Sequence, residues 1–444
     1  MVTYFGKQIR IPVLLVASYF FYYTQEPDCV LLLFGITTCS YVSVLLFENK
    51  ICNKFKVLSL SVLIHLGMLG FYKYYGFGTE NLKLIGLELP HLDVVLPIGI
   101  SFYVFQSLSY LFDVYYKAIP AEKNFFRYAL FIAFFPQLVA GPIMKARNFI
   151  PQINNPDFRI NREDIYVGIK SITIGLFLKL VIADNLAFYT HSINYPMFMN
   201  RHSLNLLFLS YGYGAQILCD FAGYSFLAIG SSRLLGFKLM MNFSYPFLAT
   251  GINDFWKRWH ISLTNWFKDY VFLRVVMSRA FRGKIYVGMM LTFLLSGLWH
   301  GASWSFVIWG GLHGLLCVIE HKLFSMLKIK SPKGILKVIL WFMTLNFVCF
   351  AFVLFALPEW EHVPDFFNAM LFSNWEKPLL LPRIGDLSFY ISLVALYHVF
   401  HALKEMFPKS FLNHRVTEVL LLSFLMVMTI NLWGESRDFI YFRF

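Results

Sequence analysis

Apolar runs long enough to cross a lipid bilayer follow one another along almost the whole chain, with short polar stretches between them. No alternation of apolar and polar residues typical of strands interrupts them, so the pattern predicts helices throughout. We therefore expect an all-α polytopic membrane protein with about 10–11 tilted transmembrane helices. The predicted runs are 11–23, 29–47, 57–77, 94–116, 125–143, 165–189, 204–235, 285–318, 335–357, 387–403 and 419–433.

Basic residues between the runs predict the orientation, because cytoplasmic loops carry an excess of Lys and Arg. Lys7 and Arg10 place the N-terminus in the cytoplasm, and the alternation that follows places the C-terminus outside. Two runs, 125–143 and 285–318, have basic residues on both flanks, so both flanks of each run are predicted to be cytoplasmic. We expect the first to be re-entrant or interfacial, because Pro136, Gly141 and Pro142 would interrupt a helix there. We expect the second to form a hairpin that turns near residues 297–301.

Composition supports a membrane protein and changes how the charge is interpreted. Hydrophobic residues make up 58% of the 444 residues and charged residues 14%, with a mean hydropathy of +0.60. A net charge of +13 would suggest nucleic acid as a partner of a soluble protein, but here the cations lie between apolar runs. They predict topology and contacts with membrane lipids or a phosphorylated donor, and no nucleic acid. The six cysteines have no spacing typical of a metal site or a disulfide framework.

A histidine inside an apolar run is the first candidate for chemistry. His300 lies in Ser-Gly-Leu-Trp-His-Gly-Ala at 296–302. An ionisable side chain in a membrane is costly and is by default a functional-site hypothesis, although a buried structural histidine is the alternative. Asp113 and Asp220 also lie within apolar runs, and we expect them to pair with a buried cation or with backbone groups.

A Trp-rich segment, residues 253–270, holds the second histidine. On one continuous helix its aromatic residues would line one side, which is typical of an amphipathic helix at the cytoplasmic interface. A plain membrane anchor explains the rings and cations but has no use for His260 between Asn253 and Asn265.

Several motifs together resemble one family. They are Asp-Phe-Trp-Lys-Arg-Trp-His-Ile-Ser-Leu at 254–263, the Trp-His-Gly of 299–301, Phe-Phe-Pro-Gln-Leu-Val-Ala-Gly-Pro-Ile at 134–143, Asp-Phe-Ala-Gly-Tyr-Ser at 220–225 and Phe-Ile-Tyr-Phe-Arg-Phe at 439–444. The chain resembles the membrane-bound O-acyltransferase (MBOAT) superfamily, most closely its AlgI-like bacterial branch and more distantly its DltB-like members. Two departures stand out: the chain is expected to begin after the usual first hydrophobic segment, and residues 272–277 replace an expected Pro-Leu-Gly-Gly.

The resemblance implies a single MBOAT-like membrane domain over residues 1–444, in which helices form a ring around a central funnel. Re-entrant or interfacial segments are expected near 125–143, 252–275 and 285–318. The resemblance implies transfer of an acyl group, most readily acetyl, from a cytoplasmic thioester such as acetyl-CoA or a carrier-protein thioester, with no bound cofactor or metal. The acceptor would be an extracytoplasmic polysaccharide or cell-wall glycan, reached in some members through an SGNH-type acyltransferase partner, and the location would be the bacterial inner membrane.

The resemblance also implies roles for individual residues. His300 and His260 are the catalytic candidates, since imidazole can take the proton of an attacking hydroxyl. The predicted substrate, donor or tunnel residues are Trp299, Asp254, Trp256, Lys257, Arg258, Trp259, Asn265 and His313. D-alanyl transfer to teichoic acid, a membrane transporter and a non-catalytic scaffold for an extracytoplasmic transferase remain as alternatives.

Overall fold

The computed structural model describes residues 7–48, 53–90, 92–155 and 159–440. Cys52 and the last four residues of the terminal motif at 439–444 lie outside the described residues. Every regular element in the described ranges is helical, which confirms the predicted all-α class. Seven of the described helices are long and apolar enough to cross a membrane: 27–48, 54–83, 162–193, 304–326, 334–356, 382–406 and 415–432. The chain is thus a multi-pass membrane protein, while the number of crossings and the ring around a funnel stay predictions.

The chain divides into two compact units. The first consists of Met1–Ile169 and Ala228–Met241, and the second of Lys170–Leu227 and Asn242–Phe444. Two helices, α8 (Arg162–Leu176) and α10 (Ser203–Leu234), contribute residues to both units. The expectation of one membrane domain over the whole chain stays a prediction.

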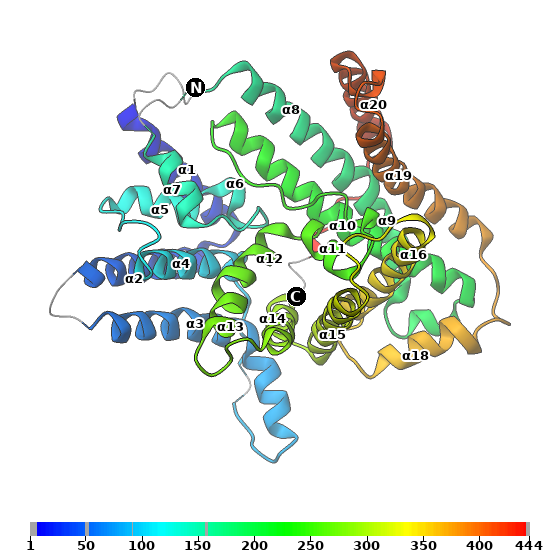
Figure 1. Ribbon diagram of the computed structural model, residues 1–444, viewed down its shortest axis with the longest axis horizontal. Helices are drawn as coiled ribbons and strands as arrows, with labels where there is room; N and C mark the ends of the chain where they lie inside the picture. Colours follow the sequence, from blue (N-terminus) through cyan, green and yellow to red (C-terminus); the bar gives the residue numbers. More distant parts are fainter. Residues whose placement is uncertain (1–6, 49–52, 91, 156–158, 441–444) are drawn as a thin grey trace. The chain divides into compact units, whose positions relative to one another are not determined.

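In the first unit, helices of spanning length are followed by short, interrupted ones (Figure 1). The predicted interruption of run 125–143 is confirmed, because α5 stops before Phe134 and Pro136 lies in the first turn of the four-residue α6. The predicted run 94–116 becomes helical only at Ile100, because Gly99 has a left-handed backbone (φ +76°). The helices are α1 (Lys7–Gln25), a 3₁₀ turn (Pro27–Cys29), α2 (Val30–Glu48), α3 (Lys54–Lys83), α4 (Ile100–Tyr115), α5 (Phe125–Ala133), α6 (Phe135–Leu138) and α7 (Ala146–Ile153).

The second unit contains both candidate histidines. Its elements are a π-helical turn (Phe177–Ala183), α9 (Asp184–Thr190), 3₁₀ turns (His191–Ile193, Met197–Asn200, Pro246–Leu248, Phe411–Asn413), α11 (Ile252–Arg258), α12 (Ile261–Phe267), a π turn (Lys268–Phe272), α13 (Leu273–Met277), α14 (Ile285–His300), α15 (Trp304–Met326), α16 (Gly334–Ala351), α17 (Val353–Ala356), α18 (His362–Asn368), a π turn (Ala369–Ser373), α19 (Leu381–Met406) and α20 (Arg415–Leu432).

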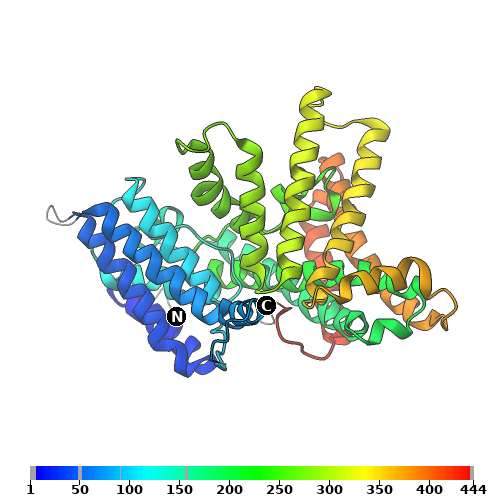
Figure 2. The same ribbon diagram turned by 90° about the horizontal axis from the view of Figure 1, so that it is seen from below.

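The predicted turn of residues 285–318 into a helical hairpin is confirmed, whereas the cytoplasmic location of its two ends stays a prediction. Helices α14 and α15 lie side by side and are joined by Gly301–Ser303, at the C-terminal edge of the predicted turn (Figure 2). Gly297 and Gly310 allow the close approach: a Cβ at Gly297 would lie 2.3 Å from the Phe306 carbonyl oxygen, and one at Gly310 would lie 2.4 Å from that of Phe293. No larger residue fits at either position without separating the two helices.

Both aspartates of the predicted apolar runs, Asp113 and Asp220, have the expected cationic partners. Lys179 Nζ lies 2.7 Å from Asp184 Oδ1 and 2.8 Å from Asp220 Oδ1, and all three side chains are buried in the second unit. Asp220 also accepts a hydrogen bond from the Ile440 N–H (2.7 Å), which ties the C-terminal segment to α10. In the first unit, Asp113 lies 3.9 Å from Arg147.

The expectation of one continuous helix through the Trp-rich segment is wrong. Helix α11 ends at Arg258 and α12 begins at Ile261, because His260 between them has a left-handed backbone (φ +43°, ψ +51°). The rings of Trp256, Trp259 and Trp266 are at most 6% exposed. They pack inside the protein, so they do not form the lipid-facing side of an interfacial helix.

Candidate active site

His260 is fixed by Asn242, a residue of the loop that follows α10. The Asn242 carbonyl accepts a hydrogen bond from the Ile261 N–H (2.9 Å). Its side-chain oxygen Oδ1 accepts from the Ser262 N–H (3.2 Å) and the Ser262 hydroxyl (2.9 Å), and it lies 3.2 Å from His260 Nδ1. The Asn242 amide nitrogen donates to Ser225 (3.2 Å). One buried asparagine therefore holds the turn at His260 through its backbone carbonyl and through its side-chain oxygen.

These contacts specify where the proton of His260 lies. The backbone N–H of Ser262 can only donate, so the Asn242 atom that it contacts is the oxygen. That oxygen can only accept, so His260 Nδ1 carries the proton and Nε2 carries the lone pair. Complete burial of the ring lowers the pKa of His260 to about 3, because the interior disfavours the charged form. His260 is a neutral imidazole with Nε2 as its basic nitrogen.

His300 is the last residue of α14 and lies close to His260. It is 1% exposed, and its ring centroid lies 6.3 Å from that of His260. This separation keeps the nitrogens of the two rings beyond hydrogen-bond reach of each other. Trp299 contacts both histidines, at centroid distances of 5.7 Å from His260 and 5.0 Å from His300. The pair can therefore act on a group placed between or beside the rings, but not by direct transfer from one ring to the other.

A column of buried rings continues from His300 along α15. Consecutive centroids are separated by 5.2, 4.5, 5.1 and 5.3 Å. The Trp256 N–H also donates to His313 Nδ1 (3.3 Å), so the rings are held by a hydrogen bond as well as by packing. We call these five rings the ring column: Trp256, His313, Trp309, His300 and Phe355.

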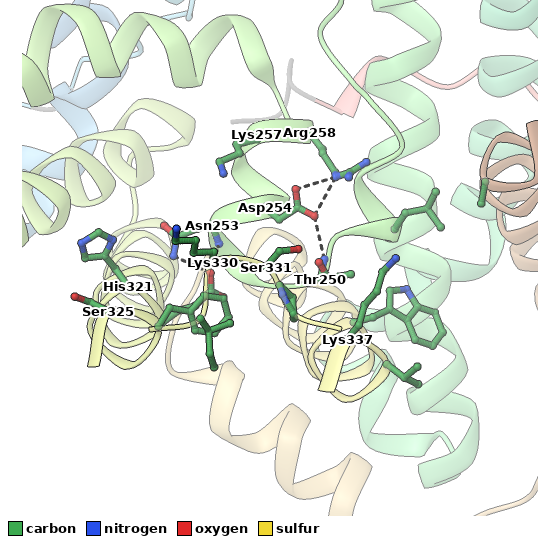
Figure 3. A pocket seen from close by; sticks show the side chains of 18 of the residues that line it. Thr250, Asn253, Asp254, Lys257, Arg258, His321, Ser325, Lys330, Ser331 and Lys337 are labelled. Atoms are coloured by element: carbon green, nitrogen blue, oxygen red, sulfur yellow. Dashed lines mark hydrogen bonds and ion pairs between the residues drawn. The ribbon is translucent and has the colours of Figure 1, made fainter. Parts of the chain in front are cut away.

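Two cavities lie at opposite ends of α15. The smaller, of about 660 Å³, is lined by Ser303 and Phe306 at the start of α15 and by Phe355 of the ring column. The larger, of about 1640 Å³, is lined by Glu320 and His321 near the end of that helix and by the polar face of α11 (Figure 3). Fifteen residues separate Phe306 from His321, roughly 22 Å of helix, which is a large part of a bilayer's thickness. The ring column lies between the two ends.

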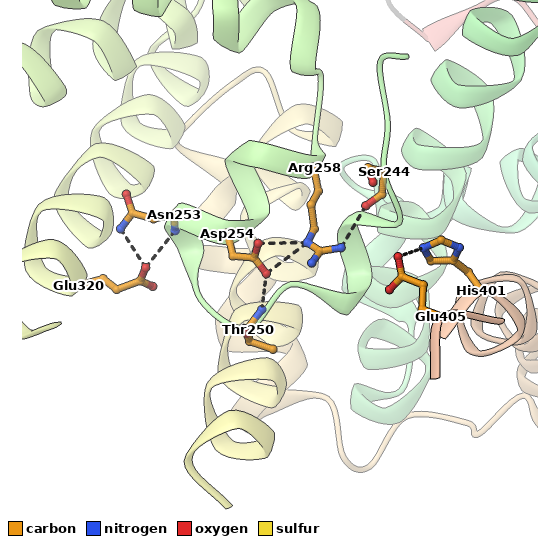
Figure 4. Close-up of polar contacts among 8 residues, drawn as sticks. All are labelled: Ser244, Thr250, Asn253, Asp254, Arg258, Glu320, His401 and Glu405. Carbon is orange, nitrogen blue, oxygen red and sulfur yellow. Dashed lines mark hydrogen bonds and ion pairs between the residues drawn. The ribbon is translucent and has the colours of Figure 1, made fainter. Parts of the chain in front are cut away.

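The larger cavity is positively charged. Its acids are already engaged: Asp254 pairs with Arg258 (3.1 Å), Glu405 with His401 (3.1 Å), and Glu320 accepts backbone hydrogen bonds (Figure 4). Within the described part of the chain no ion pair engages the four lysines of the wall, which are Lys257, Lys328, Lys330 and Lys337. Free ammonium groups around a large cavity suit a ligand with several negative charges.

Comparison with known proteins identifies the family. The family model of MBOAT, the membrane-bound O-acyltransferase family, matches residues 11–358, which is most of the chain and includes both histidines. The chain belongs to this family. It is an acyltransferase of the membrane.

Curated relatives support this assignment, and each alignment covers most of this chain and most of the relative. The probable alginate O-acetylase AlgI of Pseudomonas syringae is 35% identical over 384 residues, covering 84% of this chain and 72% of the relative. The peptidoglycan O-acetyltransferase of Helicobacter pylori is 32% identical, covering 81% and 73%. The teichoic acid D-alanyltransferase of Bacillus subtilis is 31% identical, covering 62% and 71%.

The structure distributes the predicted site residues over two places. His300, Trp256 and His313 belong to the ring column, and His260 and Trp299 lie beside it. Asp254, Lys257 and Arg258 instead line the larger cavity. Trp259, next to His260 in the chain, is fully buried against Phe255 and Phe352, and Asn265 lies half-buried on α12. The individual catalytic and binding roles stay predictions.

Two residues of this arrangement escaped sequence reasoning. Asn242 belongs to an irregular loop and Glu320 to an apolar helix, and each acts through contacts with a distant segment. Glu320 lies two residues beyond the predicted apolar run 285–318, and a carboxylate so close to a membrane segment was a usable signal, since such a group needs partners. Asn242 carries no comparable signal, because an asparagine in a loop is ordinary.

Proposed function

We propose that this MBOAT member moves an acetyl group from a cytoplasmic thioester donor, acetyl-CoA, to a hydroxyl on the other side of the inner membrane, for O-acetylation of a polysaccharide or cell-wall glycan. The observation that carries the proposal is the pair of cavities at opposite ends of α15 with His300 between them. His300 is buried and lines neither cavity, so the acetyl end of the donor and the acceptor hydroxyl would each approach it along the ring column.

The larger cavity is the proposed donor site. A nucleotide thioester carries several phosphate charges, and the four lysines of the wall supply a complementary field. The basic residues of this wall also agree with a cytoplasmic location under the positive-inside rule. On this orientation the smaller cavity faces outward. The positive-inside rule separately predicts a cytoplasmic N-terminus and an extracytoplasmic C-terminus.

The proposed chemistry needs one base. The acceptor hydroxyl oxygen attacks the thioester carbonyl carbon while His300 takes the hydroxyl proton; the carbon–sulfur bond then breaks, and the proton passes from His300 to the departing thiolate. The products are an acetyl ester and a free thiol, so the atoms balance without an oxidant or a metal. His260, neutral and oriented by Asn242, would hold the thioester carbonyl or the acceptor beside His300.

Acetyl is favoured over D-alanyl as the acyl group. The relatives named as O-acetylases match 81–84% of this chain, whereas the teichoic acid D-alanyltransferase of Bacillus subtilis matches 62%. The names of the former group suggest an alginate-like polysaccharide or peptidoglycan as the acceptor. Transfer to it could be direct or through an extracytoplasmic SGNH-type partner.

Replacing His300 tests the proposal directly. Inverted membrane vesicles would receive acetyl-CoA labelled in the acetyl group, and label in base-labile esters would be measured. His300→Ala should lower ester formation roughly 10²-fold or more while insertion into the membrane is unchanged, because a general base contributes about 10²–10⁴ in rate. His414→Ala, an exposed histidine near the start of α20, is the matched control and should keep full activity. Normal ester formation in His300→Ala would end the assignment.

The donor site has its own test. Replacing Lys257 and Lys330 by Gln should raise the KM for acetyl-CoA, and the difference from the unchanged protein should shrink as salt is added, because screened charges attract less. An equal loss at all salt concentrations would contradict an electrostatic donor site. Cargo flux without any acyl product would instead favour the transporter, and full activity without both histidines would favour the scaffold.

A further inference from the structure

The N-terminus of α11 is capped by a side chain of another helix. Glu320 of α15 accepts a hydrogen bond from the backbone N–H of Ile252 (2.6 Å, to Oε2). It also accepts one from the backbone N–H of Asn253 (3.1 Å, to Oε1) (Figure 4). Its Oε1 also accepts from the Asn253 side-chain amide (2.9 Å). Both carboxylate oxygens are therefore used, and the negative charge lies at the end of α11 where the unpaired N–H groups and the helix dipole are positive.

The backbone before α11 is shaped to admit this carboxylate. The residue at the capping position is Gly251, with φ +150° and ψ +159°, a conformation that other residues rarely adopt. A Cβ at Gly251 would lie 2.7 Å from Glu320 Oε2. The glycine thus provides both the conformation and the space, while it can supply no side-chain cap of its own.

The capping contact joins α11 to one particular face of α15. Residues spaced by four, four and three along a helix lie on one side, and on α15 this side presents Trp309, His313, Cys317 and Glu320. Two more contacts follow it: the Asn253 amide donates to the Cys317 carbonyl (3.2 Å), and the Trp256 N–H donates to His313 (3.3 Å). Contacts at three positions of α15, Glu320, Cys317 and His313, thus hold the two helices together, and His313 belongs to the ring column.

We propose that Glu320 is a positioning residue for the acyl transfer: it fixes α11 against α15, and so fixes the ring column, His300 included, and the turn that carries His260. Glu320 contributes through the alignment of α11 and does not touch the reacting atoms. Its effect on rate rests on the proposed function, whereas its effect on the seating of α11 does not.

A second acid of the same cavity, Glu405, serves to distinguish the effect of the position of Glu320 from the effect of its charge. Glu405 also lines the larger cavity but forms its ion pair with His401 (3.1 Å) of its own helix, α19, rather than with α11. Glu405→Gln therefore removes the same charge from the cavity as Glu320→Gln and leaves the α11 cap in place. Glu320→Asp keeps the carboxylate on a side chain shorter by one methylene and should restore part of whatever Glu320→Ala loses.

The first measurement needs no enzymatic activity. Cys317 is fully buried beside Asn253, so its alkylation by N-ethylmaleimide in membranes reports whether α11 is seated. Site-resolved mass spectrometry should show Cys317 alkylated roughly tenfold faster or more in Glu320→Ala, since about 1.4 kcal/mol of lost seating is tenfold in the open population. Cys349, 2% exposed on α16, is an internal control and should stay slow, which excludes general unfolding. Glu405→Gln should leave both cysteines slow.

The second measurement is the split between kcat and KM in the labelled acetyl-CoA assay. Glu320→Ala should lower kcat roughly tenfold, with part of the loss recovered by Glu320→Asp, whereas Glu405→Gln should change only the KM of the anionic donor. Unchanged Cys317 alkylation in Glu320→Ala, or an equal loss of kcat in Glu405→Gln, would overturn the proposal. Faster alkylation of Cys317 in a chain that transfers no acetyl group would retain the seating role and instead refute the proposed function.

Discussion

Asn242→Ala tests the most constrained part of the candidate site. The substitution removes the oxygen that accepts from the Ser262 N–H, the Ser262 hydroxyl and His260 Nδ1, all of which are buried. The hydroxyl can rotate toward another acceptor, but the other two donors are fixed by the turn. Each buried donor left unsatisfied costs about 1–3 kcal/mol, so the expected loss is about 2–6 kcal/mol in the free energy of unfolding.

Such a loss is a large part of the stability of a protein, which is about 5–15 kcal/mol. The assay is thermal unfolding of the detergent-solubilised protein, followed by the monodisperse fraction in size-exclusion chromatography. Asn242→Ala should lower the midpoint by several degrees, and acetyl transfer should fall further than stability because His260 loses the partner that fixes its tautomer. Ser225→Ala, which removes only the partner of the Asn242 amide nitrogen, is the matched control and should cost less.

Asn242→Asp distinguishes the tautomer from mere packing. The carboxylate still accepts from Ser262, so most of the stability should return, but its charge beside His260 favours the imidazolium and should raise the pKa of His260 from about 3. If transfer needs the neutral ring, the acid limb of the pH–rate profile should move to higher pH. Wild-type stability in Asn242→Ala would refute the hydrogen-bond argument, and an unmoved acid limb in Asn242→Asp would refute the tautomer argument.

Three further outcomes are expected. Gly310→Ala places a methyl 2.4 Å from the Phe293 carbonyl oxygen and should cost about 1–3 kcal/mol, whereas Gly311→Ala, whose nearest neighbour is 3.7 Å away, should cost almost nothing by thermal unfolding. The pKa of His260 near 3 lies below its value of about 6.5 in the unfolded chain, so the unfolded state binds more protons and the free energy of unfolding falls as the pH drops below 6.5. His260→Asn should flatten this fall by up to about 1.4 kcal/mol per pH unit. Parallel stability curves for the two proteins would contradict this expectation. Lys179→Met leaves Asp184 and Asp220 buried without their cation and should cost about 3–5 kcal/mol, with recovery when both aspartates are changed to Asn in the same chain.

The sequence was sufficient for the helical class and for the α14–α15 hairpin, for a simple physical reason. The length of an apolar run and the basic residues at its flanks are properties of that segment alone. They therefore predict how the segment meets the membrane without knowledge of its contacts with other parts of the fold. The interruption at Pro136 follows in the same way, because proline acts on its own helix.

The Trp-rich segment shows where this local reasoning ends. Its aromatic spacing suits a continuous amphipathic helix, yet the chain turns at His260 because Asn242, from a separate loop, supplies an acceptor for three donors at once. The seating of α11 by Glu320 is likewise a contact between segments about 70 residues apart, which helical periodicity does not reveal. The MBOAT resemblance could name the two histidines but not the residues that hold them.

The ring column also affects the permeability of the membrane to ions. An ion passing along α15 from one cavity to the other would have to leave its water shell among side chains such as Trp309 and His313, which are fully buried. Stripping an ion of water costs many kcal/mol in such surroundings. A protein of the proposed function can therefore present a thioester from one compartment to a hydroxyl from the other and still act as an insulator, so that acylation of a glycan outside the cell need not discharge the ion gradients across its membrane.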